Sequence, residues 1–354
     1  MDKEPFGLDL DGVVLVLQSR GGHNLGYIAI VWAKGGEVRV WGEDGSLDRC
    51  GPRCYKGAYI PAERSTTVAR PCHRIRMPKE EKQGHGEAQP LAPVLKWPGG
   101  KRSLVSAIEP FLDRPYDRLV EPFCGGAALF FHLRPPAALL ADRNAELINA
   151  YVQIRDNVED LVDRLKGMRN TEEAYYQLRD RKPRTALTRA ARFVYLMQLS
   201  FNGIYRENLR GDFNVPYGYK TWLTACDEER LCAASLALQG TECEAQTYGE
   251  TMESLRETDL VYVDPPYTVS HNDNGFIKYN RTLFSWDDQG GLAVACEQAR
   301  RKGSLVIVSN ADHSEIRALY PEFEYHQLNR FCPISGSAGG RKHVTEALLV
   351  GRPT

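Results

Sequence analysis

Short apolar runs that alternate with longer amphipathic stretches constrain this fold more than any other feature of the sequence. In the 354-residue chain, four such runs lie at residues 118–121, 138–142, 260–264 and 304–308. Strands that alternate with helices in this way are typical of an α/β unit with a mainly parallel sheet. The sequence therefore predicts an α/β fold for the chain after residue 93.

Three of these predicted strands end in an acidic residue, namely Glu121, Asp142 and Asp264. In open α/β sheets, ligands bind in the crevice outside the carboxyl ends of the strands. We therefore expect the three carboxylates to lie at one ligand-binding edge.

The interval between the second and third of these acids is too long for a single crossover, since it spans about 120 residues. Residues 145–200 have a helical pattern, and Asn170-Thr171 followed by two glutamates is a helix start. We expect a helical subdomain, at about residues 146–228, inserted between strands.

The first part of the chain differs in composition. Residues 13–17, 27–32 and 38–41 are β-branched and aromatic runs separated by glycine-rich turns, which predicts a small antiparallel sheet. We assign residues 1–76 to this β-rich appendage. Residues 77–92 lack apolar periodicity and end in prolines, so they are predicted to form a linker.

The amino terminus and the cysteines indicate in which cellular compartment the protein is expected. The amino terminus has no basic segment and its nearest apolar run is five residues long, too short for a signal peptide, so we expect a cytoplasmic protein. Nine scattered cysteines fit reduced thiols. Four residues could bind zinc, but their spacing matches no common zinc pattern and no metal is predicted: Cys50, Cys54, Cys72 and His73.

A glycine turn follows the first acid. Gly125 and Gly126 lie between Glu121 and the apolar helical run 128–133. Glycines let a ligand approach the backbone, and a helix amino terminus offers free N–H groups. The alternative is a tight strand-to-helix turn without a ligand.

Asp142 stands 21 positions after Glu121, where a Rossmann-like unit places the acid that binds two ribose hydroxyls. Alternatively, Asp142 or Asn144 is the N-cap of a helix that is expected at residues 145–165. Together with the glycine turn, the spacing favours a nucleoside ligand.

The motif Asp264-Pro265-Pro266-Tyr267 follows directly on an apolar strand. Two prolines end the strand and hold the acid and the aromatic ring in a rigid turn. A heteroaromatic base could stack on Tyr267 while its exocyclic amine donates to Asp264 and to the Pro265 carbonyl. The alternative is a proline strand stop with a surface tyrosine.

Charge is distributed unevenly along a chain whose formal net charge is −1. Residues 181–220 hold eight Lys and Arg against two acids, whereas residues 241–264 hold seven acids against one Arg. Within residues 201–217, aromatic, amide and Arg side chains interleave, a mixture that suits DNA. The alternative is a solvated basic face beside a packed loop.

Four motifs in order resemble the Dam-type adenine-N6 DNA methyltransferases, in the alpha-group order. They are Lys96-Trp97-Pro98-Gly99-Gly100-Lys101, Glu121-Pro122-Phe123-Cys124-Gly125-Gly126, the segment 202–217 and Asp264-Pro265-Pro266-Tyr267. A further likeness is Ser335-Gly336-Ser337-Ala338-Gly339-Gly340-Arg341-Lys342 between two apparent strands. The resemblance covers about residues 93–352 and implies a Rossmann-like S-adenosylmethionine-dependent methyltransferase domain, 93–354, whose insertion recognises the target.

The resemblance also implies roles for individual residues. The S-adenosylmethionine pocket is expected to be lined by Trp97, Lys101, Glu121, Phe123, Gly125, Asp142 and Asp264. The flipped adenine is expected to be held by Asp264, Pro265 and Tyr267, and Pro266 belongs to the same catalytic turn. Contacts with the duplex are expected from Lys96, Phe201, Asn202, Ile204 and Arg206, and the basic segment adds Arg210.

Many family members with this segment recognise GATC. Phe201 stands where Tyr is common, Ile204 where Leu is common, and Pro98 replaces a small residue. Phe201 can wedge into a base stack but has no hydroxyl to donate, so the recognition sequence stays open.

The expected partner is double-stranded DNA, with or without a cognate restriction endonuclease, and the expected state is a monomer or a dimer. The sequence is compatible with two alternatives. One is a methyltransferase that acts on RNA or on a protein amide, although such enzymes more often carry Asn before Pro-Pro-Tyr. The other is a catalytically inactive DNA-binding regulator.

Overall fold

The computed structural model describes residues 14–21, 24–33, 37–41, 47–49, 90–102, 104–208, 210–268, 284–331 and 343–354. The chain divides into two units, Met1–Thr66 and Thr67–Thr354. The four zinc candidates, residues 77–89 of the expected linker and the segment 335–342 lie outside the described residues.

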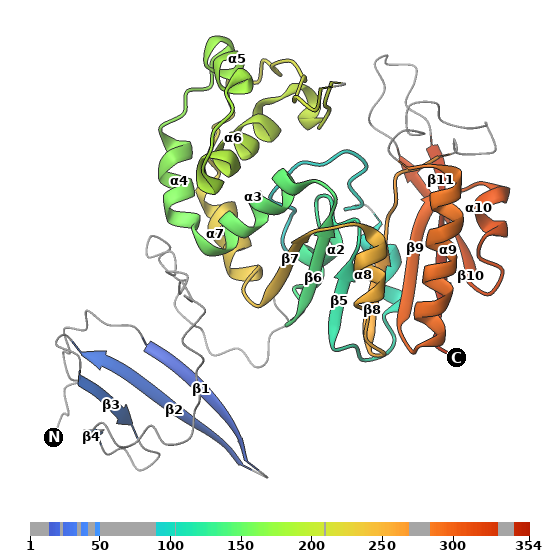
Figure 1. Ribbon diagram of the computed structural model, residues 1–354, viewed down its shortest axis with the longest axis horizontal. Helices are drawn as coiled ribbons and strands as arrows, with labels where there is room; N and C mark the ends of the chain where they lie inside the picture. Colours follow the sequence, from blue (N-terminus) through green and yellow to red (C-terminus); the bar gives the residue numbers. More distant parts are fainter. Residues whose placement is uncertain are drawn as a thin grey trace. The chain divides into compact units, whose positions relative to one another are not determined.

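A seven-stranded sheet forms the centre of the second unit, in the order β10-β11-β9-β8-β5-β6-β7 (Figure 1). Its strands are β5 (Arg118–Glu121), β6 (Ala138–Asp142), β7 (Thr241–Ala245), β8 (Asp259–Val263), β9 (Leu305–Ala311), β10 (Glu324–Phe331) and β11 (His343–Gly351). The pairs from β7 to β9 are parallel, whereas β11 runs antiparallel to β9 and β10. The predicted mainly parallel α/β sheet is confirmed.

Both faces of the sheet are buried under apolar side chains. Along β8, Leu260 and Tyr262 pack into one core cluster, while Val261 and Val263 pack into the other. This alternation follows from the two-residue period of a strand. Residues of α1 (Val105–Ile108) and α2 (Ala128–Leu133) belong to the first cluster, and the short 3-10 helix η1 (Glu109–Phe111) follows α1. Residues of three helices belong to the second cluster: α8 (Tyr248–Glu253), α9 (Trp286–Arg301) and α10 (Ser314–Ala318).

The direction of strand addition reverses beside β5. The chain places β6 and then β7 on one side of β5, and afterwards places β8 and β9 on its other side. Such a switch point leaves a crevice at the carboxyl ends of the two central strands, because the connections leave them in opposite directions. Glu121 is the last residue of β5 and Asp264 follows β8, so both predicted acids lie at the switch point.

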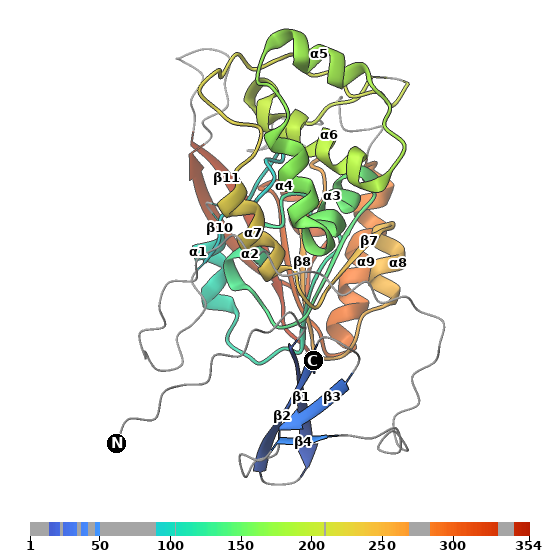
Figure 2. The same ribbon diagram turned by 90° about the vertical axis from the view of Figure 1, so that its left-hand side faces the viewer.

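A helical insertion separates β6 from β7. It contains α3 (Ala145–Asp156), α4 (Val158–Lys166), α5 (Glu172–Asp180), α6 (Ala186–Leu199), the 3-10 turn η2 (Phe201–Gly203) and α7 (Glu228–Ala237). Figure 2 shows the insertion at the end of the sheet where the parallel strands finish. A helical insertion was expected; its helices α4, α5 and α6 extend beyond this end of the sheet, whereas α3 packs against β6 and β7 with α7 beside it (Figure 1).

Two local features differ from the prediction. The run 145–165 is not one helix, because Asn157 has a non-helical backbone with φ of −137° and separates α3 from α4. Strand β7 was not predicted, since alternating acids in 241–245 conceal it. It is an edge strand whose exposed positions include Glu242 and Glu244, and charged side chains protect an edge from pairing with other chains.

The first unit contains an antiparallel sheet in the order β1-β2-β3-β4, as expected for a β-rich appendage. Its strands are β1 (Val14–Gly21), β2 (Asn24–Ala33), β3 (Glu37–Trp41) and β4 (Leu47–Arg49). Throughout the described part of the chain, no helix has the length and apolar content needed to cross a bilayer.

Candidate active site

The turn between β5 and α2 is tightly packed. Gly125 has φ of +46°, and a Cβ there would lie 2.6 Å from Cδ1 of Trp97. The Tyr151 hydroxyl donates a hydrogen bond of 2.7 Å to the Gly125 carbonyl. The predicted glycine turn therefore depends on glycine both for its backbone conformation and for the close approach of the Trp97 ring.

Glu121 stabilises the amino end of α2 from the strand below it. Its carboxylate accepts a 2.9 Å hydrogen bond from the N–H of Phe130. Burial raises the pKa of Glu121 to about 8; the Phe130 N–H opposes this rise, and the nearby Asp264 charge adds to it. Glu121 is thus a buried carboxyl below the glycine turn.

Asp142 lies at the end of β6 and binds backbone on both sides. Its two carboxylate oxygens accept hydrogen bonds from the N–H of Gly125, at 3.2 Å, and from that of Asn144, at 2.9 Å. Burial raises the pKa of Asp142, while these two N–H groups lower it. Asn144 is the side-chain cap of α3, which leaves Asp142 for another role.

Asp264 follows β8 and is held by two donors. The Ser309 hydroxyl donates to its carboxylate at 2.9 Å, and the Lys101 ammonium lies 3.2 Å from the same oxygen. Burial raises the pKa of Asp264, whereas the Lys101 charge and the Ser309 hydroxyl lower it. The side chain remains 21% exposed, which keeps the carboxylate within reach of a ligand.

Lys101 occupies the centre of the site. It is 5% exposed, and its ammonium donates to the Tyr267 hydroxyl and lies 4.4 Å from the centroid of that ring. A second carboxylate, that of the fully buried Glu346 on β11, lies 3.4 Å from the ammonium. The ion pairs compensate for burying this charge.

The Asp264-Pro265-Pro266-Tyr267 turn is anchored by two buried amides. Gln289 of α9 donates to the Pro266 carbonyl at 3.2 Å, and Asn310 of β9 donates to the Gln289 side-chain oxygen at 3.1 Å. Both side chains are fully buried. Two prolines contribute no N–H of their own, so the turn is fixed through its carbonyls.

Phe123 belongs to an aromatic cluster beside the glycine turn. Its ring stacks on Tyr248 with centroids 5.6 Å apart, and the edge of Phe284 meets it at 5.6 Å. The cluster gives this side of the site an apolar, aromatic wall.

Five residues that contribute to this site were not identified from the sequence. They are Tyr248, Gln289, Ser309, Asn310 and Glu346. Of these, Glu346 has the clearest sequence signal, because a single carboxylate within the apolar strand 343–351 requires a buried partner.

Residues 200–217, which we call the recognition segment, form a loop closed by two antiparallel bridges, Ser200 to Tyr217 and Glu207 to Phe213. Phe201 is 50% exposed, and Asn202 has φ of +54° next to Gly203 at +64°. Figure 1 shows the neighbouring elements of the insertion in green and yellow. The turn thus presents an aromatic ring and an amide to solvent.

Some basic side chains of the insertion are exposed, and others form contacts within the insertion. Arg206 is exposed and donates to the Asn214 side chain at 2.8 Å, and Arg210 is exposed as well. By contrast, Arg189 pairs with Glu146, and Arg192 donates to backbone carbonyls within the insertion. Part of the excess of Lys and Arg in residues 181–220 therefore stabilises the insertion itself.

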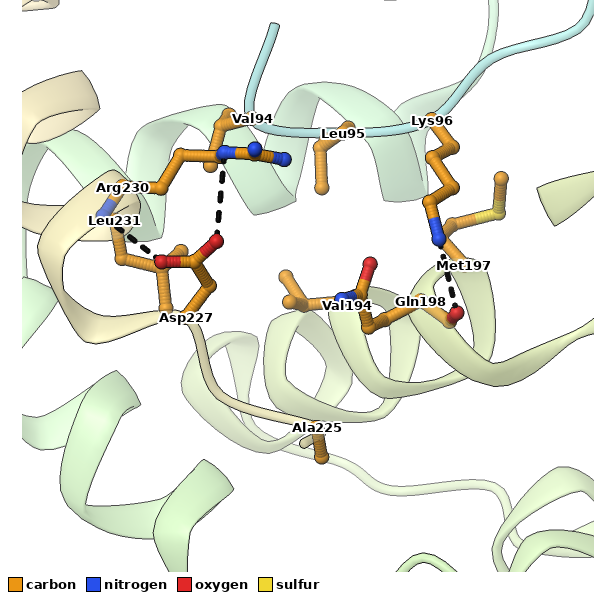
Figure 3. Close-up of a pocket in the computed structure, with 10 residues that line it drawn as sticks. All are labelled: Val94, Leu95, Lys96, Val194, Met197, Gln198, Ala225, Asp227, Arg230 and Leu231. Carbon is orange, nitrogen blue, oxygen red and sulfur yellow. Dashed lines mark hydrogen bonds and ion pairs between the residues drawn. The ribbon is translucent and has the colours of Figure 1, made fainter. Parts of the chain in front are cut away.

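Lys96 is half-buried beneath the recognition segment. Its ammonium donates to the Gln198 carbonyl at 3.3 Å, and its pKa is lowered by burial and by the charges of Lys220 and Arg230. Figure 3 shows it at one end of a hollow between the segment 94–96 and helices α6 and α7, with the Asp227–Arg230 pair opposite. None of the strand-end carboxylates lines this hollow.

The structure thus brings Trp97, Lys101, Glu121, Gly125, Asp142, Asp264 and Tyr267 to one edge of the sheet. Among the described residues, no group of three or more His, Cys, Asp or Glu side chains could hold a metal ion. The functional groups that these residues bring to the edge are carboxylates, one ammonium group and aromatic rings.

Comparison with known proteins gives consistent matches. The family model described as D12 class N6 adenine-specific DNA methyltransferase matches residues 97–333. The type II methyltransferase M1.LlaDCHI of Lactococcus lactis subsp. cremoris is 34% identical over 269 residues, which cover 73% of this chain and 95% of the relative. The retron Ec67 DNA adenine methylase of Escherichia coli is 35% identical over 268 residues, covering 73% and 91% respectively. The DNA adenine methylase of Vibrio cholerae serotype O1 is 33% identical over 266 residues, covering 73% and 95%.

Proposed function

The chain belongs to the D12 class N6 adenine-specific DNA methyltransferases, and on this premise we propose that it transfers the methyl group of S-adenosylmethionine to a flipped-out adenine in duplex DNA. The observation that carries this proposal is the meeting of Asp264 and Tyr267 with Lys101 at the switch point of the sheet. The Gly125 turn and Asp142 lie at the same edge.

The residues of this edge fit S-adenosylmethionine. Each oxygen of Asp142 accepts one backbone N–H, and a carboxylate offers about four lone-pair sites, so both oxygens can also accept a ribose hydroxyl. Trp97, Phe123 and the glycine turn form apolar walls. Glu121, Lys101 and Asp264 complete the proposed cofactor-binding set.

When bound, S-adenosylmethionine supplies a methyl group on a positively charged sulfur. The protein has to place the adenine amine in line with it, and positioning two reactants can contribute about 7 to 11 kcal/mol. Asp264 and the Pro265 carbonyl accept the two N–H groups of that amine and stabilise its growing positive charge. The leaving group is the neutral thioether S-adenosylhomocysteine, and the methylated amine then loses one N–H proton to water. The Tyr267 ring supports the base by stacking, while Pro266 fixes the turn.

Asp264 has to be ionised to accept the amine. Burial and the nearby Glu346 charge oppose ionisation by raising the pKa of Asp264, but the Lys101 charge and the Ser309 hydroxyl lower this pKa. Lys101 therefore keeps the acceptor charged, and the adenine amine then takes the place of the ammonium at the Asp264 oxygen. Glu346 retains Lys101 nearby after this exchange, because its carboxylate pairs with the same ammonium.

Duplex binding is assigned to the insertion, at about residues 146–228 of a methyltransferase domain that we place at residues 93–354. Flipping a base costs a few kcal/mol, and the exposed ring of Phe201 fills the space in the stack. Lys96, Asn202, Ile204, Arg206 and Arg210 are proposed to contact the duplex, with GATC as the first sequence to test. A relative named as a type II methyltransferase makes a cognate restriction endonuclease a further proposed partner.

The proposal is tested by giving the purified chain duplex DNA and S-adenosylmethionine labelled on its methyl group. We expect label in DNA at N6 of adenine, and single-molecule sequencing of DNA from an expressing host identifies the methylated sequence. Asp264→Ala is the inactive control. If adenines remain unmodified under both conditions, the proposed reaction is wrong; modification at a site other than GATC would change only the recognition sequence.

A further inference from the structure

Tyr205 joins the recognition segment to the proposed cofactor site. Its ring stacks on that of Trp97, with centroids 5.0 Å apart and planes inclined by 23°. Trp97 in turn lies against the glycine turn, where a Cβ at Gly125 would approach it to 2.6 Å. A continuous packed contact therefore runs from the recognition segment through Tyr205 and Trp97 to the turn between β5 and α2.

The hydroxyl of Tyr205 makes a contact within the recognition segment. It donates a hydrogen bond to the carboxylate of Glu207. The ring of Tyr205, and not its hydroxyl, therefore makes the contact with the proposed cofactor site.

Tyr205 lies between two residues that are proposed to contact the duplex, Ile204 and Arg206. Ile204 has extended backbone angles, φ of −78° and ψ of 138°. Tyr205 is turned toward Trp97, whereas Arg206 is exposed and bonded to Asn214. A displacement of the Tyr205 ring therefore moves the two proposed duplex contacts on either side of it.

The same cofactor motif holds the recognition segment at another point. Lys96 precedes Trp97, and its Cδ lies 2.6 Å from where a Cβ at Gly203 would be. Gly203 has φ of +64°, so the segment turns there with no room for a side chain. Residues 96 and 97 therefore fix the segment at both Gly203 and Tyr205.

We propose that Tyr205 is a positioning residue that couples occupancy of the cofactor site to duplex recognition. A cofactor that orders Trp97 also orders Tyr205 and the contacts beside it, and a bound duplex orders Trp97 in return. The inference rests on the proposed function. Because linkage is reciprocal, each ligand tightens binding of the other by the same factor.

Isothermal titration calorimetry of the full chain measures this coupling without any methyl transfer. The first probe is S-adenosylhomocysteine, which has no methyl group to donate. The second probe is a duplex that contains the recognition sequence of the wild-type enzyme. Linked sites commonly change affinity by about 5- to 150-fold. We expect the duplex to tighten S-adenosylhomocysteine binding by about fivefold or more in the wild type.

Two substitutions separate the ring from the hydroxyl. Tyr205→Leu removes the stack and is expected to reduce the coupling factor to about twofold or less, a loss within the range that single substitutions cause between coupled sites. Tyr205→Phe retains the ring and is expected to keep most of the coupling. Tyr176→Leu, at a half-buried aromatic position elsewhere in the insertion, is the matched control and should leave the coupling factor unchanged.

The outcomes are distinct. A wild-type coupling factor in Tyr205→Leu overturns the proposal, and so does a loss in Tyr205→Phe as large as that in the Leu variant. If the wild type binds both probes without coupling, the inference is wrong while the proposed function stands. If it binds neither probe, the proposed function itself fails. Thermal unfolding of each variant verifies that it is folded.

Discussion

The buried carboxylate of Glu346 lies 3.4 Å from the ammonium of Lys101, although the two residues come from opposite ends of the methyltransferase region. Lys101 therefore has two carboxylate partners, and Asp264 is the one that retains exposed surface. Because Glu346 stays paired with it, the Lys101 ammonium can leave Asp264 without becoming an unpaired buried charge. An unpaired charge in the interior would be costly in free energy.

Replacing Glu346 by Gln is expected to lower the methylation rate by about tenfold, equivalent to about 1.4 kcal/mol. The Lys101 charge is then left to Asp264 alone and competes with the adenine amine. Single-turnover rates at saturating DNA and S-adenosylmethionine measure the effect, with Glu324→Gln on the exposed part of β10 as the control.

If Glu346 acts through Lys101, its substitution should cost little more in a Lys101→Met background, because the charge that it pairs with is gone. Such non-additivity is expected of residues in contact. Fully additive losses in the two variants would contradict this role for Glu346.

Asp264→Ala is expected to abolish methylation while most of the DNA affinity remains. The carboxylate accepts the amine at the reacting centre, whereas the proposed duplex contacts lie on the insertion and at Lys96. A filter assay with labelled S-adenosylmethionine and a gel-shift titration measure the two properties separately. Near-native turnover of this variant would falsify the assignment.

Gly125→Ala is expected to weaken S-adenosylmethionine binding by more than about tenfold, or about 1.4 kcal/mol. The new Cβ would lie 2.6 Å from Trp97, and φ of +46° adds backbone strain. Gly240→Ala is the matched control, since φ there is +76° but the nearest atom to its Cβ is 3.5 Å away. Equal effects of the two substitutions would reduce the role of Gly125 to backbone strain.

Arg206→Ala is expected to relax discrimination at one base pair by about 1 to 3 kcal/mol. The guanidinium is exposed and is oriented by Asn214, as a side chain that reads a base edge should be. Competition binding with single-substituted duplexes measures it. A loss that is equal for specific and random duplexes would instead identify Arg206 as a phosphate contact.

Glu121 should make the folded state less stable as the pH rises. Because its pKa in the folded protein is about 8 rather than 4.5, the folded chain keeps a proton that the unfolded chain has released between these values. Its contribution is thus fully present below about pH 4.5 and is lost as the pH approaches 8. Over this interval, each rise of one pH unit lowers the free energy of unfolding by about 1.4 kcal/mol at most.

Glu121→Gln removes this dependence, since the amide stays neutral and its oxygen can still accept from the Phe130 N–H. Denaturant unfolding at pH 5.5 and at pH 8 is expected to show a smaller stability difference in the variant than in the wild type. An unchanged difference would mean that Glu121 ionises freely in the folded protein.

Local sequence patterns were sufficient for much of the catalytic domain's framework. Apolar runs predicted β5 and β6 at their observed bounds, and β8 and β9 to within three residues at each end. Helix α2 agrees with the apolar run after the glycine turn, and Thr171 caps α5 as its position suggested. These features depend on neighbours in the sequence, so periodicity and capping residues reveal them.

Other features depended on distant segments. The Asn144 side chain caps α3 by accepting from the N–H groups of Glu146 and Leu147, whereas Asp142 accepts the N–H of Gly125 from another loop. Strand β7 remained hidden because its edge position allows acids where an inner strand would need apolar residues.

The sequence by itself therefore determined the kind of fold, the order of its motifs and the acids that end its central strands. Only the tertiary structure decided which side chains complete the site: Glu346 beside Lys101, Gln289 behind the proline turn and Tyr205 on Trp97. The reason is physical. Backbone conformation follows from local sterics and the period of apolar residues, whereas these contacts exist only after strands and loops far apart in the chain have packed together.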